Sequence, residues 1–172
     1  FMIQNVLAAT LACFVHGVSL ESIRAGLTTF TPSTAQTRGR MNIIEIEDFT
    51  VLMDFAHNPA GFIGLRDFIR NLNYTTSTGI LSGVGDRRDE DMIRQGEILG
   101  SNFDRVILYE DRYLRGREEG EIMSLFRQGA ERGGRAREIL EVRGAVKSVE
   151  TALATVGKEQ LLVIQADVVD ET

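Results

Sequence analysis

Residues 50–61 read Thr-Val-Leu-Met-Asp-Phe-Ala-His-Asn-Pro-Ala-Gly. The apolar run Thr50–Phe55 is typical of a strand, and the polar turn after it ends at Pro59, where proline is favoured as a first helical residue. The stretch therefore predicts a strand, a short turn and a helix over Ala60–Leu72. A strand-turn-helix unit of this kind is the building block of an α/β fold.

The same alternation of strands and helices continues along the rest of the sequence. The candidate strands are short and apolar without regular alternation, which indicates a sheet covered on both faces. We therefore expect an α/β fold with a doubly wound, mostly parallel, Rossmann-like sheet of about six strands flanked by helices. The first strand is expected to pair antiparallel with the second through a turn at Glu47 and Asp48. The expected strands are Ile43–Ile46, Thr50–Phe55, Thr78–Ser82, Arg105–Tyr109, Glu138–Val142 and Leu161–Gln165, and the helices are Ala60–Leu72, Glu90–Phe103, Glu118–Arg132 and Ala145–Val156.

A short helical segment precedes this α/β region. Residues 3–16 are apolar nearly all round, which predicts a buried helix ended by Gly17. Ser19 is expected to begin a second helix that runs to about Leu27. Residues 28–38 are polar and β-branched, a composition typical of a linker.

The composition argues against several classes of protein. The chain has 172 residues and a net charge of −6, which suits one globular domain with a small attached piece and no nucleic-acid partner. No apolar run approaches the ~20 residues of a membrane-spanning helix, so no membrane partner is expected. Cys13 is the only cysteine, and it and His16 lack a second ligand pair, so neither a disulfide nor a metal site is expected. Lys147 and Lys158 are the only lysines, and neither lies in a phosphate-binding Gly-x-x-x-x-Gly-Lys-Ser/Thr loop.

Candidate site residues lie at four junctions, because open α/β sheets bind ligands at the carboxyl ends of their strands. Asp54, His57 and Asn58 form the first, beside a helix N-terminus that favours anions. An alternative interpretation has equal weight. In it, Asn58 only caps the helix, and Asp54 and His57 only fix the turn. At the second, Arg40 offers a guanidinium to a phosphate, next to Gly39, which allows a close backbone approach.

The other two junctions carry mixed charges. Residues 82–88 form a glycine turn that presents charged groups to a ligand, and their incomplete Gly-x-Gly pattern is weak support for a nicotinamide site. Residues 110–117 alternate acids with arginines, which together can bind both ends of an amino acid. From the residues alone, an ordinary salt-bridged loop is the better interpretation of residues 110–117. The candidate ligands in these two junctions are Asp86, Arg87, Glu110, Asp111 and Arg115.

Two of these segments together resemble the Mur ligase family of ATP-dependent, amide-forming enzymes. Gly39-Arg40-Met41-Asn42 and then Asp54-Phe55-Ala56-His57-Asn58-Pro59 resemble the family's Gly-Arg-Met and Asp-Tyr/Phe-Ala-His-Asn-Pro motifs, in the same order and spacing. The resemblance covers essentially the whole chain. Within the family, Gly85–Asp91, Tyr109–Arg117 and Leu162–Asp167 look most like the branch of cyanophycin synthetases.

The resemblance implies a division of the chain. Residues 1–34 would be the helical tail of the family's central ATPase domain plus a linker, and residues 35–172 the C-terminal α/β domain. Asn5 matches an asparagine that contacts adenine in relatives, whereas Met2 departs from the family pattern. The phosphate-binding lysine and most contacts to Mg²⁺ would lie in a preceding domain, so the chain alone would be inactive.

The resemblance also implies a reaction in which ATP phosphorylates a carboxylate and an amine attacks the acyl phosphate. Arg40, Asp54 and His57 would be catalytic, and Asn5, Arg40 and Asp54 would bind ATP, with Mg²⁺ as a further cofactor. The substrate would contact Asn58, Asp86, Arg87, Glu110, Asp111 and Arg115.

The implied partners are ATP, an amino acid, an acidic peptide or polymer acceptor and the upstream domains of the same chain, in the cytoplasm. The best match implies that arginine is joined to the aspartate side-chain carboxylate of a polymer. Two alternatives stay open. One is a ligase of the muramyl peptide or folylpolyglutamate type, and the other is a non-catalytic binding module with the same fold.

Overall fold

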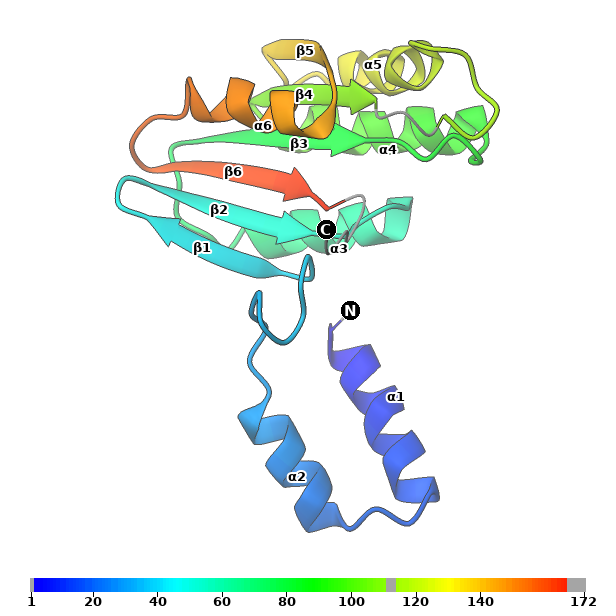
Figure 1. The fold of residues 1–172 in the computed structure, drawn as a ribbon, viewed down its shortest axis with the longest axis vertical. Coiled ribbons are helices and arrows are strands. Elements are labelled where there is room, and N and C mark those ends of the chain that lie inside the picture. Colours follow the sequence, from blue (N-terminus) through cyan, green and yellow to red (C-terminus); the bar gives the residue numbers. More distant parts are fainter. Residues whose placement is uncertain (1, 111–113, 167–172) are drawn as a thin grey trace. The chain divides into compact units, whose positions relative to one another are not determined.

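The computed structural model describes residues 2–110 and 114–166 of the chain. The chain divides into two compact units, Phe1–Pro32 and Ser33–Thr172. The first unit is helical and the second is an α/β domain (Figure 1). Among the described residues, no helix combines the length and the hydropathy needed to cross a bilayer.

The helical unit consists of α1 (Met2–Val15) and α2 (Leu20–Thr29). Gly17 adopts a φ of +81°, the left-handed conformation that ends many helices. The Ser19 hydroxyl accepts a hydrogen bond of 3.1 Å from the backbone N–H of Ser22, as an N-cap does. The helix end predicted at Gly17 and the helix start predicted at Ser19 are therefore confirmed.

The apolar surface of α1 is exposed. Ile3, Leu7, Leu11 and Phe14 are each more than half exposed. The prediction of a buried helix is therefore wrong for this unit. A helix that is apolar on all sides needs partners on all sides, and this unit offers it only α2.

The α/β unit is built on one six-stranded sheet in the order β1-β2-β6-β3-β4-β5 (Figure 1). β1 and β2 pair antiparallel, with Ile44 opposite Val51, and the other neighbouring strands pair parallel. Both the predicted hairpin and the mostly parallel Rossmann-like sheet are confirmed. The strands are β1 (Asn42–Ile46), β2 (Phe49–Asp54), β3 (Thr76–Ser82), β4 (Arg105–Glu110), β5 (Glu138–Arg143) and β6 (Gln160–Gln165).

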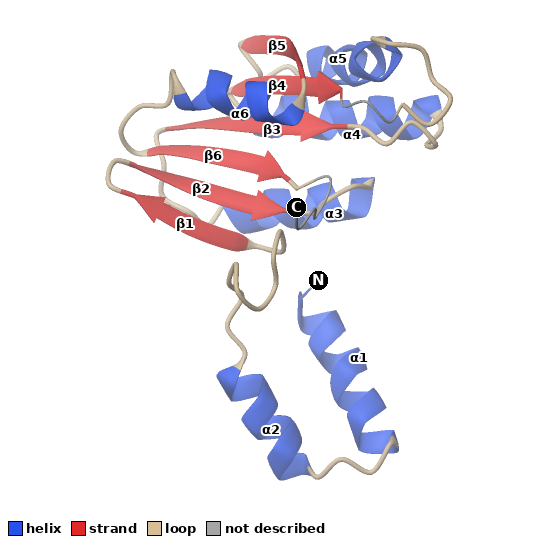
Figure 2. Cartoon of the chain, viewed as in Figure 1, coloured by secondary structure: helices blue, strands red, loops and turns tan. Residues whose placement is uncertain are grey.

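Helices cover both faces of the sheet, but unequally (Figure 2). The chain moves across the sheet in one direction from β2 to β5 and returns to β6 in the other. Because parallel connections are right-handed, this reversal places the last connecting helix on the opposite face, which makes the sheet doubly wound as predicted. The first face carries α3 (Pro59–Ile69), α4 (Asp89–Asn102) and α5 (Glu121–Gly133), and the second carries α6 (Ala145–Leu153).

Each face of the sheet has its own hydrophobic core. Leu52, Leu81 and Leu108 point to the first face, where α3 and α5 add aromatic side chains such as Phe62 and Phe126 and α4 adds aliphatic ones. The alternate strand residues form the second core, which contains Val51, Ile80, Ile107, Tyr109 and Leu162 with Ala152 of α6. Alternation of strand side chains between two covered faces explains why the strands lack a polar side.

The predicted helices are all present, with ends displaced by up to three residues. α3 and α6 end before Leu72 and Val156 because their last turns tighten. There the Leu72 N–H donates to the Ile69 carbonyl at 3.0 Å and the Thr155 N–H to the Ala152 carbonyl at 3.1 Å. α5 begins late because its N-cap is a glycine in the left-handed conformation.

α4 and α5 contact each other backbone to backbone. A Cβ added to Gly100 would lie 1.9 Å from the carbonyl oxygen of Ala130, and one added to Gly129 would lie 2.0 Å from that of Ile93. No side chain fits at those separations, so the two helices can pack this closely only with glycine at the crossing. Each helix carries a Gly-x-x-x-Gly pair, and the four residues are Gly96, Gly100, Gly129 and Gly133.

Candidate functional site

The carboxyl ends of the central strands lie side by side along one edge of the sheet. The backbone N–H of Ala166, just after β6, donates to the Asp54 carbonyl oxygen at the end of β2 (2.8 Å). The side chain of Gln165 accepts a hydrogen bond from the backbone N–H of Ser82 at the end of β3 (3.0 Å). The direction of strand connections reverses here, which is where open α/β sheets bind ligands.

The turn that carries Arg40 is attached to this edge by Asp54. Asp54 Oδ2 accepts a hydrogen bond from the Met41 backbone N–H at 3.0 Å. Asn42 holds the turn from inside, because it is fully buried and its Oδ1 accepts from the Gly39 N–H at 2.8 Å. Its Nδ2 donates to the Arg40 carbonyl oxygen at 3.1 Å. The position of Arg40 is therefore set by hydrogen bonds between its turn and the buried side chains of Asp54 and Asn42.

The guanidinium of Arg40 stacks on an aromatic ring. Its Cζ lies 4.4 Å from the centroid of Phe55, and the Phe55 and His57 rings lie 5.0 Å apart. Arg40 itself is exposed. The ring orients one face of the guanidinium and leaves the rest open, which suits bidentate binding of a phosphate or carboxylate.

The imidazole of His57 is held in one orientation. Its Nδ1 lies 3.0 Å from the carbonyl oxygen of Phe55. A carbonyl oxygen can only accept, so Nδ1 carries the proton in this contact and Nε2 of the neutral ring does not. The neutral ring of His57 therefore presents Nε2 as a hydrogen-bond acceptor.

The carboxyl group of Asp54 is almost completely buried. Burial raises its pKa above the usual value, and the backbone N–H groups of Met41, Ala56 and Phe55 together with the charge of Arg40 partly oppose the rise. Asp54 therefore accepts its hydrogen bonds at a cost in desolvation of its charge. Such a perturbed carboxyl group in a strand-end turn is typical of a functional site.

Replacing Asp54 with asparagine should make stability less dependent on pH. The raised pKa means that the folded state binds the Asp54 proton more tightly than the unfolded state does. Wild-type stability is therefore lost as the pH rises from about 4 through the raised pKa. Asparagine accepts the same hydrogen bond from Met41 without titrating. The free energy of unfolding of Asp54→Asn minus that of the wild type, measured in urea, should increase from pH 4 to pH 7, and a constant difference would contradict the shift.

Asn58 is the N-cap of α3. Its Oδ1 accepts a hydrogen bond of 2.8 Å from the Gly61 backbone N–H, and Pro59 occupies the first turn. The helix cap predicted at Asn58 is thus confirmed. A contact between Asn58 and substrate stays a prediction.

The two mixed-charge junctions lie together in space. Arg115 Nη1 lies 2.9 Å from Asp86 Oδ2, and both side chains are more than half exposed. Arg87 is also exposed. Asp111 lies outside the described residues. The structure therefore brings one predicted residue from each junction into a single exposed ion pair.

Glu110 is buried at the end of β4 and caps α5. Its Oε2 accepts from the Gly120 N–H at 2.7 Å and its Oε1 from the Met123 N–H at 3.2 Å. A carboxylate at a helix N-terminus is stabilised by the helix dipole. Glu110 thus closes the base of the loop that carries Arg115, and its predicted contact with substrate stays a prediction.

Asn42 and Arg117 also organise this edge, and neither was predicted as a site residue. Asn42 directly follows Gly39-Arg40-Met41, so its position beside that motif was the available signal. Arg117 lies in the loop of alternating charges, where the sequence does not distinguish an internally bonded arginine from a solvated one.

The sequence of this chain matches a known protein family. Residues 39–167 match the family model described as Mur ligase, glutamate ligase domain. The chain belongs to the Mur ligase family. A cyanophycin synthetase from Geminocystis herdmanii is 42% identical over 164 residues, which is 95% of this chain and 19% of the relative. A UDP-N-acetylmuramyl-tripeptide synthetase from Roseiflexus sp. is 35% identical over 112 residues, 64% of this chain and 21% of the relative.

Solved structures share the Mur ligase fold. The structure of E. coli FolC in complex with ADP matches 95% of this chain and 36% of that chain, with a TM-score of 0.69 and 22% identity. The present chain spans about a fifth of the length of the cyanophycin synthetases that it matches. It matches one part of each of these relatives.

Asn5 of this Mur ligase chain lies on α1, in the helical unit, and is exposed. Its contact with adenine stays a prediction, as does the assignment of residues 1–34 to a central ATPase domain. Within residues 2–110 and 114–166, no three His, Cys, Asp or Glu side chains gather as a metal site.

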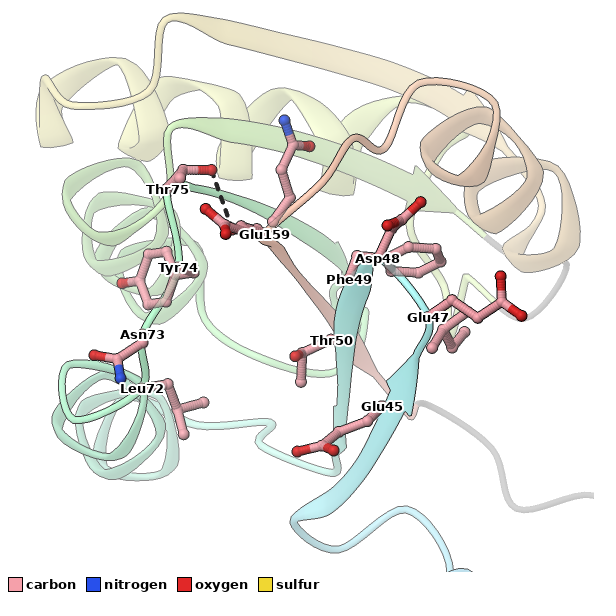
Figure 3. A pocket seen from close by; sticks show the side chains of 12 residues that line it. Glu45, Glu47, Asp48, Phe49, Thr50, Leu72, Asn73, Tyr74, Thr75 and Glu159 are labelled. Carbon is pink, nitrogen blue, oxygen red and sulfur yellow. Dashed lines mark hydrogen bonds between the residues drawn. The ribbon is translucent and has the colours of Figure 1, made fainter.

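A pocket of about 650 Å³ lies at the opposite edge of the Mur ligase sheet, near the amino ends of β2, β3 and β6 (Figure 3). Thr50, Tyr74 and Glu159 are among its lining residues, and the Thr75 hydroxyl donates to the Glu159 carbonyl oxygen at 3.0 Å. None of the predicted site residues that the structure describes lines it. The predicted site is thus an open strand-end surface, separate from this pocket.

Proposed function

We propose that this chain is the C-terminal part of an ATP-dependent ligase that joins an amino acid to a carboxylate through an acyl phosphate. The observation that carries the proposal is Arg40, which stacks on Phe55 beside the buried Asp54 at the reversal point of the sheet. Membership of the Mur ligase family supports it.

In this proposal the residues at the carboxyl end of β2 and in the Arg40 turn bind the nucleotide and the negatively charged phosphoryl group. ATP supplies the phosphoryl group that activates the carboxylate. Arg40 binds the transferring phosphoryl group or the acyl phosphate and offsets the charge that develops there. Asp54 orients the Arg40 turn and accepts a hydrogen bond from the nucleotide, and His57 accepts one through Nε2.

The phosphate-binding part of the nucleotide site is proposed to lie outside the 172 residues. They contain no Gly-x-x-x-x-Gly-Lys-Ser/Thr loop, and Arg40 is the only arginine that the proposal assigns to the phosphates. We place the phosphate-binding lysine and the Mg²⁺ ligands in a preceding ATPase domain of a longer protein. Residues 1–34, with Asn5 near the adenine, would belong to that domain, and residues 35–172 would cover its site.

The exposed pair of Asp86 and Arg115 is proposed to bind the amino acid. A substrate with a cationic side chain and a carboxylate can replace each partner of the pair, since Asp86 attracts the cation and Arg115 the carboxylate. Arginine fits this requirement, and the 42% identity to a cyanophycin synthetase supports arginine as substrate and an aspartate-containing polymer as acceptor. The remaining proposed contacts are Asn58, Arg87, Glu110 and Asp111.

An assay of the full-length protein tests this function. We expect ADP release that requires both arginine and an acceptor with free aspartate carboxylates. Other amino acids, a muramyl peptide and a folylpolyglutamate serve as comparison substrates. Turnover with the muramyl peptide or the folylpolyglutamate would assign the protein to the corresponding branch of the family. An absence of turnover with every substrate would favour a non-catalytic binding module. The 172-residue chain alone is expected to release no ADP. Because the proposed reaction needs ATP, we place the protein in the cytoplasm.

A further inference from the structure

Arg117 connects the two segments that carry the exposed ion pair. Its Nε donates to the Gly85 carbonyl oxygen at 3.0 Å, and its Nη2 donates to the Arg87 carbonyl oxygen at 2.7 Å. Arg117 belongs to the loop after β4, whereas both acceptors belong to the turn after β3. One guanidinium therefore bonds two backbone carbonyls of the neighbouring turn.

The same guanidinium is neutralised on both sides. Nη2 lies 2.6 Å from Asp89 Oδ1 at the start of α4, and Nη1 is paired with Glu121 at the start of α5. These contacts raise the pKa of Arg117. The Arg117 side chain is only 15% exposed, although it belongs to a surface loop. The guanidinium of Arg117 is thus bound by groups of the protein itself and is not available to a ligand.

The two segments are also in backbone contact where Arg117 joins them. A Cβ added to Gly85 would lie 2.0 Å from the carbonyl oxygen of Leu114. Any residue other than glycine would force the segments apart. Arg117 and Gly85 therefore act at the same contact. Arg117 donates hydrogen bonds across it, and Gly85 lets the two backbones approach because it has no side chain.

We infer that Arg117 is a positioning residue for the amino-acid site, because it locks residues 114–121 onto residues 83–89 and so sets the spacing of Asp86 and Arg115. An incoming amino acid must separate Asp86 from Arg115 and insert its own charged groups. The segments that carry the two residues must stay in place while the pair opens. Arg117 acts through Asp86 and Arg115 and does not itself touch substrate.

The planar fork of arginine is essential to this role. Lysine keeps the charge but cannot direct separate N–H groups to two carbonyl oxygens and two carboxylates at once. Arg117→Lys therefore tests geometry rather than charge. Arg94→Lys is the matched control, because Arg94 lies on α4 and pairs only with Glu97 among the described contacts, at the surface.

Steady-state kinetics of the full-length ligase provide the first measurement. The inference rests on the proposed function. Arg117→Lys should raise the KM for the amino acid about tenfold or more, with the KM for ATP and kcat each changed by about twofold at most. Arg94→Lys should leave all three constants unchanged. An unaltered KM for the amino acid, or an equal rise in the KM for ATP, would overturn the positioning role.

Hydrogen exchange of the same proteins without substrates provides the second measurement. Amides of residues 83–89 and 114–121 should exchange faster in Arg117→Lys, while the amides of β2, β3 and β6 keep their protection, which also shows that the variant is folded. Unchanged exchange at the two segments would overturn the lock. A wild-type protein that ligates no amino acid would overturn the proposed function and with it the amino-acid role, whereas exchange would still decide whether Arg117 joins the segments.

Discussion

Replacing Arg40 with alanine in the full-length protein should lower kcat/KM for the proposed amide formation about 100-fold to 1,000-fold. The substitution removes a cation that is already oriented, since Asp54 and Asn42 fix its turn and Phe55 stacks on its guanidinium. A group held in place before the reaction stabilises developing negative charge without being reorganised. The measurement is the rate of ADP release with saturating acceptor.

Two further variants make the Arg40 result specific. Arg40→Lys keeps the charge but loses the planar stack on Phe55, so its kcat/KM should lie between those of the wild type and Arg40→Ala. Arg94→Ala removes an arginine that is ion-paired on α4 and should leave kcat/KM unchanged. If Arg40→Ala is folded and turns over at the wild-type rate, Arg40 is not the phosphate-binding residue.

The second large effect is expected on stability. Gly129→Ala should lower the free energy of unfolding by about 3 kcal/mol, because the added Cβ would lie 2.0 Å from the Ile93 carbonyl oxygen and must push α4 and α5 apart. The helices cannot separate without opening the core between Phe126 and the sheet. Urea denaturation followed by circular dichroism measures the loss.

Gly26→Ala is the control for this substitution. Gly26 lies within α2, and a Cβ there would meet no atom within 4 Å. Alanine is the better helix former by about 1 kcal/mol, so this variant should be as stable as the wild type or slightly more stable. Equal losses in Gly26→Ala and Gly129→Ala would mean that the α4–α5 contact is not the cause.

The fold was predictable because its signals are local. A short apolar run such as Thr50–Phe55 indicates a strand that is covered on both faces. Pro59 indicates the start of a helix from its own backbone geometry, without information about residues far away in the sequence. The hairpin was predictable for the same reason, since its strands are separated by a short polar turn. Strand order was not, because the place of β6 between β2 and β3 depends on contacts over more than 80 residues.

The candidate site was predictable in part. Motif order led to Arg40 and Asp54, and in the structure Asp54 holds the turn that carries Arg40 through a hydrogen bond from Met41. Arg117 was missed because every arginine in an alternating loop looks alike until the partner turn is known. The exposure of α1 and the Gly-x-x-x-Gly contact of α4 with α5 were missed for a related reason. Both depend on which surface each helix meets, and periodicity within one helix does not identify that surface.

The central position of β6 also governs how the domain is made. On a ribosome, β2 is complete about 100 residues before β6 begins, which is on the order of 5–20 s of synthesis. During that time the hairpin of β1 and β2 has no third strand, and an isolated hairpin is only marginally stable. Asp54 and the turn that it anchors therefore reach their final positions only after β6 has joined the sheet. A nascent chain should acquire the proposed anion-binding edge in one late step, so incomplete chains present no half-formed version of it.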